Sequence, residues 1–479
     1  MIELSRRSGI IIPREYENES WYHLVRAKLF RKQQQYNSPD FITNKYFSES
    51  EKFLTIPRFF PIHDYVDCKI IDNRHVGEDI EIEHSIVARN EAQELTMDYM
   101  INNQNGMIKL NPGMGKTVVS IYMIAVRKKK SMILVHRDSL DKQWRKRLFE
   151  HSDIDSDKVC ILNSAKFEKQ LAECSIIIAT CQTILSLLKR KRMEYLIALN
   201  KANIGIFIGD EIHTTLGAPT FSNCSLHTPA AVTYGLSATP YRNDGNTDIL
   251  KFHVGEQFAI DSDEDTMPAE VTFVLLDFDI DTPRRERYLN WEGNFQRARY
   301  LNIMKNSKVF MDLVKALLMK LTKENRHLLF ISERVDKMIV PLYDWLPFED
   351  KSKFIAGSSL DELEKQITFS TPGKIRDGID VPWKDSLLIT SPVKNIEQLC
   401  GRITRIYPKN IMYPEHDKFT PSVLDMVDIG CDNIKSSFWS RVDYYKSKNW
   451  KINYLFVNQF TYEKFKLKEE DAFTIVRGE

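Results

Sequence analysis

Residues 111–117 of this chain read Asn-Pro-Gly-Met-Gly-Lys-Thr, directly after an apolar run at 107–110. A helical pattern follows and continues to Ile124. A strand, a glycine-bearing turn and a helix in this order are the context of a phosphate-binding loop. The motif therefore predicts a parallel α/β sheet with a site at the carboxyl ends of its strands.

The residue types in the loop suit a nucleoside triphosphate. Gly113 and Gly115, with Met114 between them, let successive backbone N–H groups face phosphate oxygens at a helix N-terminus. We expect Lys116 to reach the β- and γ-phosphates as a point charge, and Thr117 to offer its hydroxyl to Mg²⁺. ATP and Mg²⁺ are therefore the expected cofactors.

Two carboxylates follow a second apolar run at 204–208. Acidic residues at such a strand end are costly unless they hold a cation. We expect Asp210 to take the magnesium ion through water and Glu211 to polarise the attacking water. Upstream of the loop, Gln93 either reads the adenine edge with its amide or is a surface glutamine on a helix.

Composition sets wide limits. With 479 residues the chain exceeds one ordinary core, so two or three domains are expected. Its 67 Lys and Arg nearly balance its 66 Asp and Glu, so contact with nucleic acid must come from local patches. The seven cysteines lack zinc or iron–sulfur spacing, which favours reduced thiols. Because no apolar signal core or bilayer-length run is present, we expect a soluble intracellular protein.

Apolar strands alternate with amphipathic helices from about residue 85, which predicts two α/β domains after a small α+β N-terminal domain. The strand candidates are 107–110, 132–135, 176–179, 204–208, 233–236, 271–276, 328–331, 353–355, 367–369 and 387–389. Helices are expected at about 20–35 and 296–321, and around 438–446, where an amphipathic pattern predicts docking on the second domain.

An acidic stretch at 261–268 marks the break between the two halves. The predicted divisions are 1–84 for an accessory domain and candidate for DNA or junction binding, 85–262 for the first α/β domain, 263–300 for a linker and domain crossover, and 301–479 for the second α/β domain with its C-terminal docking helix.

Four motifs in register resemble motifs I, II, III and VI of superfamily 2 helicases and translocases. They are the loop at 113–117, Asp-Glu-Ile-His at 210–213, Ser-Ala-Thr-Pro at 237–240 and Gln-Leu-Cys-Gly-Arg-Ile-Thr-Arg at 398–405. Within the superfamily, Trp144 and Arg242, just past Ser-Ala-Thr-Pro, resemble the sequence pattern of the XPB-like branch. That branch includes compact UvsW-type helicases of phages and large DNA viruses. The resemblance implies two tandem RecA-like domains, a nucleic-acid-stimulated ATPase and, for a viral chain, the host-cell cytoplasm.

The resemblance also implies catalytic roles in the second domain. Arg402 and Arg405, three residues apart on one face of a helix or turn, would act as arginine fingers on the γ-phosphate. Gln398 would position the attacking water or the phosphate. Asp380, in the motif V segment at 378–382, would belong to the nucleotide site.

Coupling and nucleic-acid contact are implied at the remaining motifs. Ser237, Thr239 and His213 would relay the state of the bound nucleotide to the nucleic-acid side of the protein. The track on nucleic acid would be formed by residues of motifs Ia and Ib and of the loop before motif V: Arg137, Thr180, Gln182 and Thr371.

Two departures from the family pattern bear on the substrate. Asp-Glu-Ile-His in motif II is unlike the Asp-Glu-Ala-Asp of DEAD-box RNA helicases. Pro372 follows Thr371 and removes a backbone donor from a loop expected to contact nucleic acid.

Several basic or aromatic segments allow two interpretations. The runs at 127–130 and 189–192 either widen the nucleic-acid footprint or are merely solvated. Trp21 with the cations of its helix, and Pro-Arg-Phe-Phe-Pro at 57–61, either grip a strand junction or belong to a core.

The leading hypothesis is an ATP-dependent DNA helicase or translocase, working as a monomer, that unwinds or remodels duplex or branched DNA in phage or viral replication, recombination or transcription. An RNA helicase and a duplex translocase without strand separation are the alternatives. A nucleotide-gated clamp that no longer hydrolyses is disfavoured, because Lys116, Glu211, Arg402 and Arg405 are all present.

Overall fold

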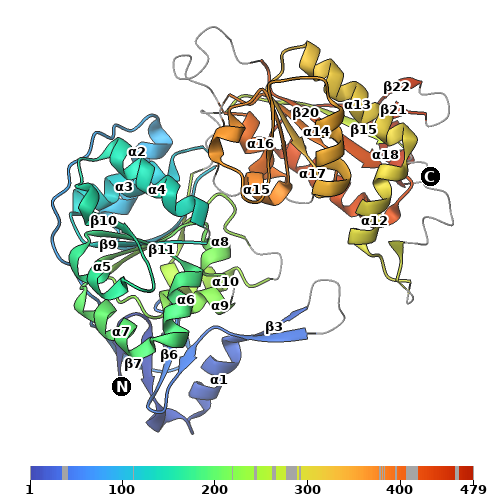
Figure 1. Ribbon diagram of the computed structural model, residues 1–479. Helices are drawn as coiled ribbons and strands as arrows, with labels where there is room; N and C mark the ends of the chain where they lie inside the picture. The colour runs from blue at the N-terminus through green and yellow to red at the C-terminus, as the bar shows by residue number, and fades with distance from the viewer. Residues whose placement is uncertain are drawn as a thin grey trace. The chain divides into compact units, whose positions relative to one another are not determined.

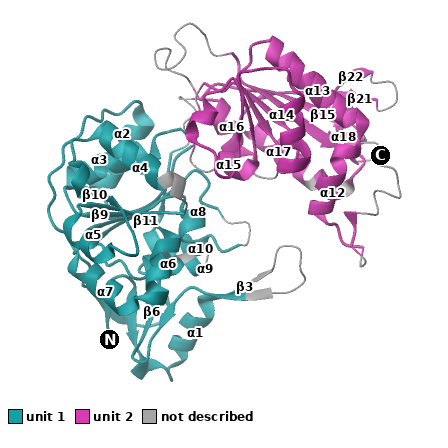
Figure 2. Ribbon diagram, viewed as in Figure 1, with its two compact units in different colours: residues 1–262 teal, residues 263–479 magenta. Residues whose placement is uncertain are grey.

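The chain forms two compact units, residues 1–262 and 263–479 (Figure 2). The computed structural model describes residues 2–34, 41–111, 113–136, 138–217, 219–241, 245–260, 266–276, 288–290, 293–376, 379, 381, 383–393, 396–405, 419–458 and 463–477. Each unit is built around its own parallel sheet.

The described N-terminal residues of unit 1 form a small mixed sheet in the order β5-β6-β2-β1-β7. Its strands are β1 (Ile2–Arg6), β2 (Ile10–Pro13), β5 (Ser48–Glu49), β6 (Phe53–Ile56) and β7 (Cys68–Asp72). In the chain, a 3₁₀ turn at Arg14–Tyr16, helix α1 (Ser20–Lys28) and the hairpin of β3 (Phe30–Gln34) and β4 (Phe41–Lys45) lie between β2 and β5. A second 3₁₀ turn at Ile62–Asp64 lies between β6 and β7. This α+β module confirms the expected small N-terminal domain.

The helix predicted over 20–35 is too long. It ends at Lys28, because Phe30–Gln34 pairs antiparallel with Phe41–Lys45 instead of continuing the helix. Partner strands far along the chain carry no signal in a helical window, so tertiary pairing overrides the local pattern here.

The main sheet of unit 1 has the order β10-β11-β9-β12-β13-β8-β14, and every described pair is parallel. Its strands are β8 (Asn105–Lys109), β9 (Ser131–Val135), β10 (Val159–Ile161), β11 (Ile176–Thr180), β12 (Ile206–Gly209), β13 (Val232–Ser237) and β14 (Gln257–Ala259). The connections contain α2 (Glu91–Asn102), α3 (Lys116–Arg127), α4 (Asp138–His151), a 3₁₀ turn at Ser156–Lys158, α5 (Phe167–Glu173), α6 (Cys181–Arg190), α7 (Arg192–Lys201), α8 (Ile212–Thr215), α9 (Pro219–Ser225) and α10 (Asp248–Val254).

Both faces of this sheet are buried. Along β9, Ile133 and Val135 pack toward one core, and Met132 and Leu134 toward the other. The first core is shared with α2, α3 and α4, and the second with α5, α6 and α7, which lie on opposite faces of the sheet (Figure 1). Burial on both sides explains why the strands read as continuous apolar runs.

Unit 2 has a second sheet in the order β17-β18-β16-β19-β20-β15-β21-β22, parallel except for β22 at the edge. Its strands are β15 (Glu270–Leu276), β16 (Leu328–Ile331), β17 (Lys351–Phe354), β18 (Ile367–Ser370), β19 (Ser386–Ile389), β20 (Ser422–Asp428), β21 (Lys451–Val457) and β22 (Lys464–Leu467). Its helices are α12 (Arg297–Ile303), α13 (Lys308–Lys323), α14 (Val340–Trp345), α15 (Pro372–Arg376), α16 (Glu397–Ile403), α17 (Asp432–Ser447) and α18 (Glu469–Arg477), with one-turn helices at Met304–Asn306, Val335–Ile339 and Leu360–Leu363.

Two features of unit 2 differ from the sequence prediction. The single helix expected at 296–321 is divided into α12 and α13, because Ser307 caps a new helix by accepting a hydrogen bond from Phe310 N at 3.3 Å. Within the segment predicted as linker and crossover, β15 already belongs to the sheet. The predicted C-terminal docking helix is confirmed as α17, whose Phe438 and Val442 enter the core of unit 2.

The aromatic and basic turn at 57–61 fastens the N-terminal module to the main sheet of unit 1. Arg58 is fully buried and donates hydrogen bonds to Thr233 Oγ1 (2.8 Å) and to the carbonyls of Ser225 (2.6 Å) and Thr228 (3.0 Å). Phe60 is also buried and packs edge-on against Phe252 of α10. The interpretation of this turn as a grip on a junction is therefore wrong, since its guanidinium is used inside the protein.

Candidate active site

The phosphate-binding loop connects β8 to α3 in unit 1. Gly113 and Gly115 both have positive φ, at 94° and 78°, so the turn needs residues without a Cβ. A Cβ on Gly115 would lie only 2.5 Å from Nε2 of Gln93. Lys116 is the first residue of α3, with its Nζ 3.4 Å from the carbonyl oxygen of Leu110, and Thr117 follows it in the first turn. Met114 is buried beneath the loop, and Pro112 lies outside the described residues.

Gln93 braces this loop from α2. It is 2% exposed, so the alternative of a surface glutamine is wrong. Its Nε2 donates to the carbonyl of Met114 at 3.0 Å, and its Oε1 accepts from the backbone N–H of Arg89 at 2.9 Å. Arg89 in turn donates to the carbonyl of Gly113 at 3.0 Å. The amide is engaged with the backbone on both sides, and its reading of adenine stays a prediction.

Asp210 and Glu211 stand at the carboxyl end of β12, and each is only 8% exposed. Asp210 Oδ1 accepts from the N–H of Glu211 at 2.9 Å, and its Oδ2 accepts from Nε1 of Trp144 at 2.8 Å. Burial, followed by the charge of Glu211, raises the pKa of Asp210, while Lys116 opposes this shift by its positive charge. The charge of Lys116 thus acts on Asp210 from the loop at the neighbouring end of the same sheet.

Glu211 has an unusual backbone. Its φ of 45° lies in the left-handed region, which residues other than glycine rarely adopt. Its Oε2 is buried and accepts no hydrogen bond within the described residues, and His213 Nδ1 lies 3.6 Å away. The turn thus presents one buried carboxylate oxygen that accepts no hydrogen bond from the described residues.

Motifs II and III are joined by a short hydrogen-bonded chain. His213 Nδ1 lies 2.9 Å from Ser237 Oγ, at the end of β13, and Thr239 N donates to the same Oγ at 3.1 Å. Ser237 is fully buried. The three predicted coupling residues are therefore brought together within unit 1.

The predicted nucleic-acid residues of unit 1 lie at the start of α6. Thr180 is 4% exposed and caps this helix, its Oγ1 accepting from Thr183 N at 3.2 Å. Gln182 is exposed and its Nε2 donates to the carbonyl of His136 at 3.1 Å, which ties motif Ib to motif Ia. Arg137 itself lies outside the described residues.

The motif VI arginines of unit 2 do not share a helical face. Arg402 is on α16, 4% exposed, and its Nε donates to the carbonyl of Ile375 in α15 at 3.3 Å. The helix ends at Ile403, and Arg405 lies beyond the cap, in a β-bridge with Thr266. Arg405 is therefore not on the helix that carries Arg402, and a common direction of the two guanidinium groups stays a prediction.

The other predicted residues of unit 2 are partly described. Gln398 is half-buried in α16, next to Glu397 at the start of the helix. Thr371 precedes α15, and its carbonyl accepts from Lys374 N at 3.1 Å. Pro372 is the first residue of α15, where the missing N–H has no partner within a helix in any case. Asp380 lies outside the described residues.

Two contributors to this site were missed by the sequence analysis. Trp144 was noted only as a family marker, yet its indole N–H holds Asp210. Arg89 received no role, yet it contacts the phosphate-binding loop. A buried tryptophan that needs a partner for its N–H is a signal that could have pointed to the first of these.

Comparisons with known proteins agree with this geometry. Residues 80–242 match the family described as "Type III restriction enzyme, res subunit". The "Putative ATP-dependent RNA helicase L396" of Acanthamoeba polyphaga mimivirus is 23% identical over 393 residues, covering 78% of this chain and 71% of the relative. The "Transcript termination protein A18" of Yaba-like disease virus is 26% identical over 413 residues, covering 77% of this chain and 81% of the relative.

A shorter stretch is similar to a cellular protein. The "General transcription and DNA repair factor IIH helicase/translocase subunit XPB" of Schizosaccharomyces pombe is 27% identical over 171 residues, covering 34% of this chain and 21% of the relative. Among solved structures, Dbp5 of S. cerevisiae bound to RNA and ADP BeF3 superposes with a TM-score of 0.51 and 15% identity, covering 81% of this chain and 93% of that chain. This likeness shows the fold, two tandem RecA-like domains.

The protein is thus an enzyme of the helicase class, a nucleic-acid-dependent ATPase. Within that class its sequence is similar to superfamily 2 helicases of viruses and, over a shorter stretch, to XPB. Among the described residues, no helix is both long enough and apolar enough to cross a bilayer. The seven cysteines are all buried and free of disulfide bonds.

Proposed function

We propose that this protein is an ATP-dependent DNA helicase or translocase that unwinds or remodels duplex or branched DNA, in viral replication, recombination or transcription. The observation that carries the proposal is the placement of Lys116 at the start of α3, directly after the phosphate-binding loop, and of the buried pair Asp210 and Glu211 at the carboxyl end of β12 in the same parallel sheet of unit 1. A cation from the phosphate-binding loop beside two buried carboxylates is the arrangement that triphosphate hydrolysis needs.

The residues present fit a magnesium ion. Asp210 has a raised pKa through burial and the charge of Glu211, and Glu211 keeps a buried oxygen without a hydrogen bond among the described groups. An added divalent cation relieves both the burial and the repulsion of the carboxylates. Thr117 and Asp210 are the proposed ligands, the latter through water. When bound, the ion neutralises charge on the phosphates.

The protein's own groups then have separate tasks. Backbone N–H groups of residues 113–116 and the Lys116 ammonium hold the phosphates. Glu211 orients the attacking water and accepts its proton. Ser237, Thr239 and His213 transmit the nucleotide state toward the nucleic acid.

Residues of unit 2 complete the proposed cycle. Arg402 and Arg405 stabilise the charge on the γ-phosphate, Gln398 positions the water, and Asp380 contributes to the nucleotide site. Arg137, Thr180, Gln182 and Thr371 contact phosphates and sugars of the strand. We propose that the protein works as a monomer, since the motifs for both halves of the site are present in one chain.

DNA is favoured over RNA by two observations. Motif II is Asp-Glu-Ile-His, and the relative XPB is named as a DNA repair factor. The mimivirus relative is named as an RNA helicase, so RNA is the second candidate substrate.

The test is the steady-state ATPase rate with single-stranded DNA, duplex DNA, a four-way junction and RNA, at one stated salt concentration because phosphate contacts weaken with salt. Stronger stimulation by DNA than by RNA supports the proposal, and stimulation by RNA alone overturns it. A strand-displacement assay follows. Stimulation by duplex DNA without displacement would favour a translocase that leaves the strands paired.

A further inference from the structure

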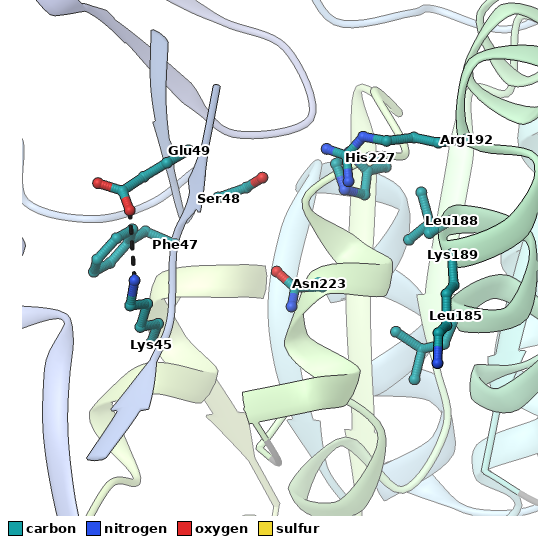
Figure 3. A pocket seen from close by; sticks show the side chains of 10 residues that line it. All are labelled: Lys45, Phe47, Ser48, Glu49, Leu185, Leu188, Lys189, Arg192, Asn223 and His227. Carbon is teal, nitrogen blue, oxygen red and sulfur yellow. Dashed lines mark ion pairs between the residues drawn. The ribbon is translucent and has the colours of Figure 1, made fainter. Parts of the chain in front are cut away.

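A groove of about 430 Å³ lies in unit 1 between the N-terminal module and the helices around α6 (Figure 3). One wall is the chain segment from the end of β4 through β5, and the other comes from α6, α7 and α9. Its apolar lining is Phe47, Leu185 and Leu188, and its basic lining is Lys45, Lys189 and Arg192. The groove lies away from the nucleotide site, at the opposite end of α6 from Thr180.

The basic side chains leave the groove with excess positive charge. Glu49, the carboxylate in the lining, already pairs with Arg26 at 2.9 Å and with Arg14 and Lys45 at 3.6 Å. Lys189 and Arg192 are exposed and form no ion pair with any described residue. His227 in the same lining is neutral at physiological pH, because burial and then Arg192 lower its pKa to about 4. An anionic ligand is therefore favoured.

The two walls are held together before any ligand arrives. The hydroxyl of Tyr46 donates to the carbonyl of Gly217 at 3.2 Å, and Arg31 at the base of the hairpin pairs with Asp248 of α10 at 2.5 Å. Arg58 adds its buried bonds to the main sheet. A pre-formed groove binds without the cost of ordering its walls.

Helix α6 connects this groove to the proposed track. Gln182 is in its first turn and Lys189 is near its last residue. The seven helical steps from Gln182 to Lys189 extend about 10 Å. Along a stacked strand the phosphates advance by about 3.4 Å per nucleotide, so about three nucleotides cover that distance. A strand that touches the beginning of α6 can therefore reach the groove at its end.

We propose that this groove binds the sugar-phosphate backbone of a single nucleic-acid strand that flanks the segment held by the motor. The volume is near the lower end of the range of about 300–1,000 Å³ typical of small-molecule sites, which suits a nucleotide unit of one strand and not a duplex. Lys45, Lys189 and Arg192 pair with the phosphates. The inference rests on the proposed function and adds to it a second contact outside the helicase motifs.

The test compares a groove variant with a matched control. The variant Lys189→Ala/Arg192→Ala removes two groove cations. The control Arg190→Ala/Lys201→Ala removes the same charge from the same two helices, at exposed residues that do not line the groove. Binding is measured by fluorescence anisotropy with a short oligodeoxynucleotide of about eight nucleotides and a long one of about thirty, a range that spans common single-strand site sizes.

The groove variant is expected to bind the long strand about tenfold more weakly at low salt than the wild type does, and its salt slope is expected to fall by about 1.4, for two lost phosphate contacts. The control and the short strand should behave as in the wild type. Equal binding of the long strand by both double variants overturns the proposal. The proposal is also overturned if the groove mutations weaken the binding of a polyglutamate peptide and leave the binding of DNA unchanged. In that case the groove would serve an acidic protein segment.

The ATPase rate with the short oligonucleotide separates this inference from the proposed function. The groove variant should retain it, because the motor track is intact. Absence of stimulation in the wild type by any polynucleotide would contradict the proposed function, whatever the groove binds.

Discussion

The indole Nε1 of Trp144 donates a 2.8 Å hydrogen bond to Oδ2 of Asp210, and Trp144 is almost completely buried. The other oxygen of Asp210 accepts from the backbone of Glu211. One carboxylate is thus fixed by two donors from separate elements, α4 and the turn after β12. A ligand held in this way can meet a metal ion in one orientation.

Replacement of Trp144 by Phe keeps an aromatic ring in the core and removes the donor. We expect Trp144→Phe to raise the Mg²⁺ concentration for half-maximal ATPase about 10- to 100-fold, as loss of an outer partner of a metal ligand does. Titration of Mg²⁺ at saturating ATP measures this. The control is Trp383→Phe, which removes a 3.2 Å indole bond to the carbonyl of Leu363 in unit 2. An unchanged Mg²⁺ dependence in Trp144→Phe would mean that the bond does not orient a metal ligand.

Asp210 gives a prediction about stability and pH. Its pKa is raised in the folded protein, chiefly by burial and then by Glu211, so the folded state binds more protons than the unfolded state between about pH 3.9 and the raised pKa. Stability therefore falls as pH rises through that window, and the charged carboxylate costs stability at neutral pH. Asp210→Asn should raise the melting temperature of the metal-free protein at pH 7 and abolish Mg²⁺-dependent turnover.

Calorimetry without metal tests this prediction at pH 7 and at a pH near 4. The difference in melting temperature between Asp210→Asn and wild type should shrink at the lower pH, because the raised pKa of Asp210 lets the native carboxyl take up its proton before the unfolded one does. A variant that melts below the wild type at neutral pH would show that the hydrogen bonds from Trp144 and Glu211 outweigh the burial of the charge.

The two arginines of motif VI should differ in their effect on stability. Both Arg402→Lys and Arg405→Lys are expected to lower kcat about 10³-fold or more, because each removes a forked guanidinium that stabilises the charge on the γ-phosphate. Arg402→Lys should lower the melting temperature more than Arg405→Lys does, because Arg402 is buried and donates to the carbonyl of Ile375, whereas Arg405 is only partly buried. The control is Arg299→Lys, an exposed arginine of unit 2 with one bond to the carbonyl of Leu289. Near-normal kcat in both motif VI variants would remove the arginine-finger role.

Arg58 is predicted to be a structural lock. Arg58→Met leaves several buried acceptors without a donor, and each such loss costs about 1–3 kcal/mol. We expect a clearly lower melting temperature, with linear and branched DNA affected alike at temperatures where the variant is folded. Arg7→Met, which removes an exposed arginine bonded to Asn200, is the control. Selective loss on branched DNA would restore the junction hypothesis for this turn.

Buried parallel strands were the easiest elements to predict. Continuous apolar runs such as Ile176–Thr180 identify themselves because both faces of the sheet are covered. Strand β20 escaped prediction because Asp425 interrupts its apolar pattern. That carboxylate is fully buried against Arg441 of α17, with Nε to Oδ2 at 2.6 Å, a partner that no local window contains.

Much of the candidate site could be predicted from short local motifs. The phosphate-binding loop and Asp210 with Glu211 follow from short sequence patterns whose geometry is set by neighbouring backbone. The hydrogen bonds from Trp144 and Gln93 depend on how α4 and α2 pack on the sheet, so no local sequence pattern predicts them.

Glu211 is proposed to activate water for hydrolysis of ATP in a site that nucleic acid stimulates. The most direct test is the ATPase rate of wild type and Glu211→Gln with saturating single-stranded DNA, together with nucleotide affinity. We expect DNA-stimulated turnover in the wild type and a loss of about 10²- to 10⁴-fold in Glu211→Gln, with nucleotide binding retained. Turnover by Glu211→Gln at the wild-type rate would contradict it.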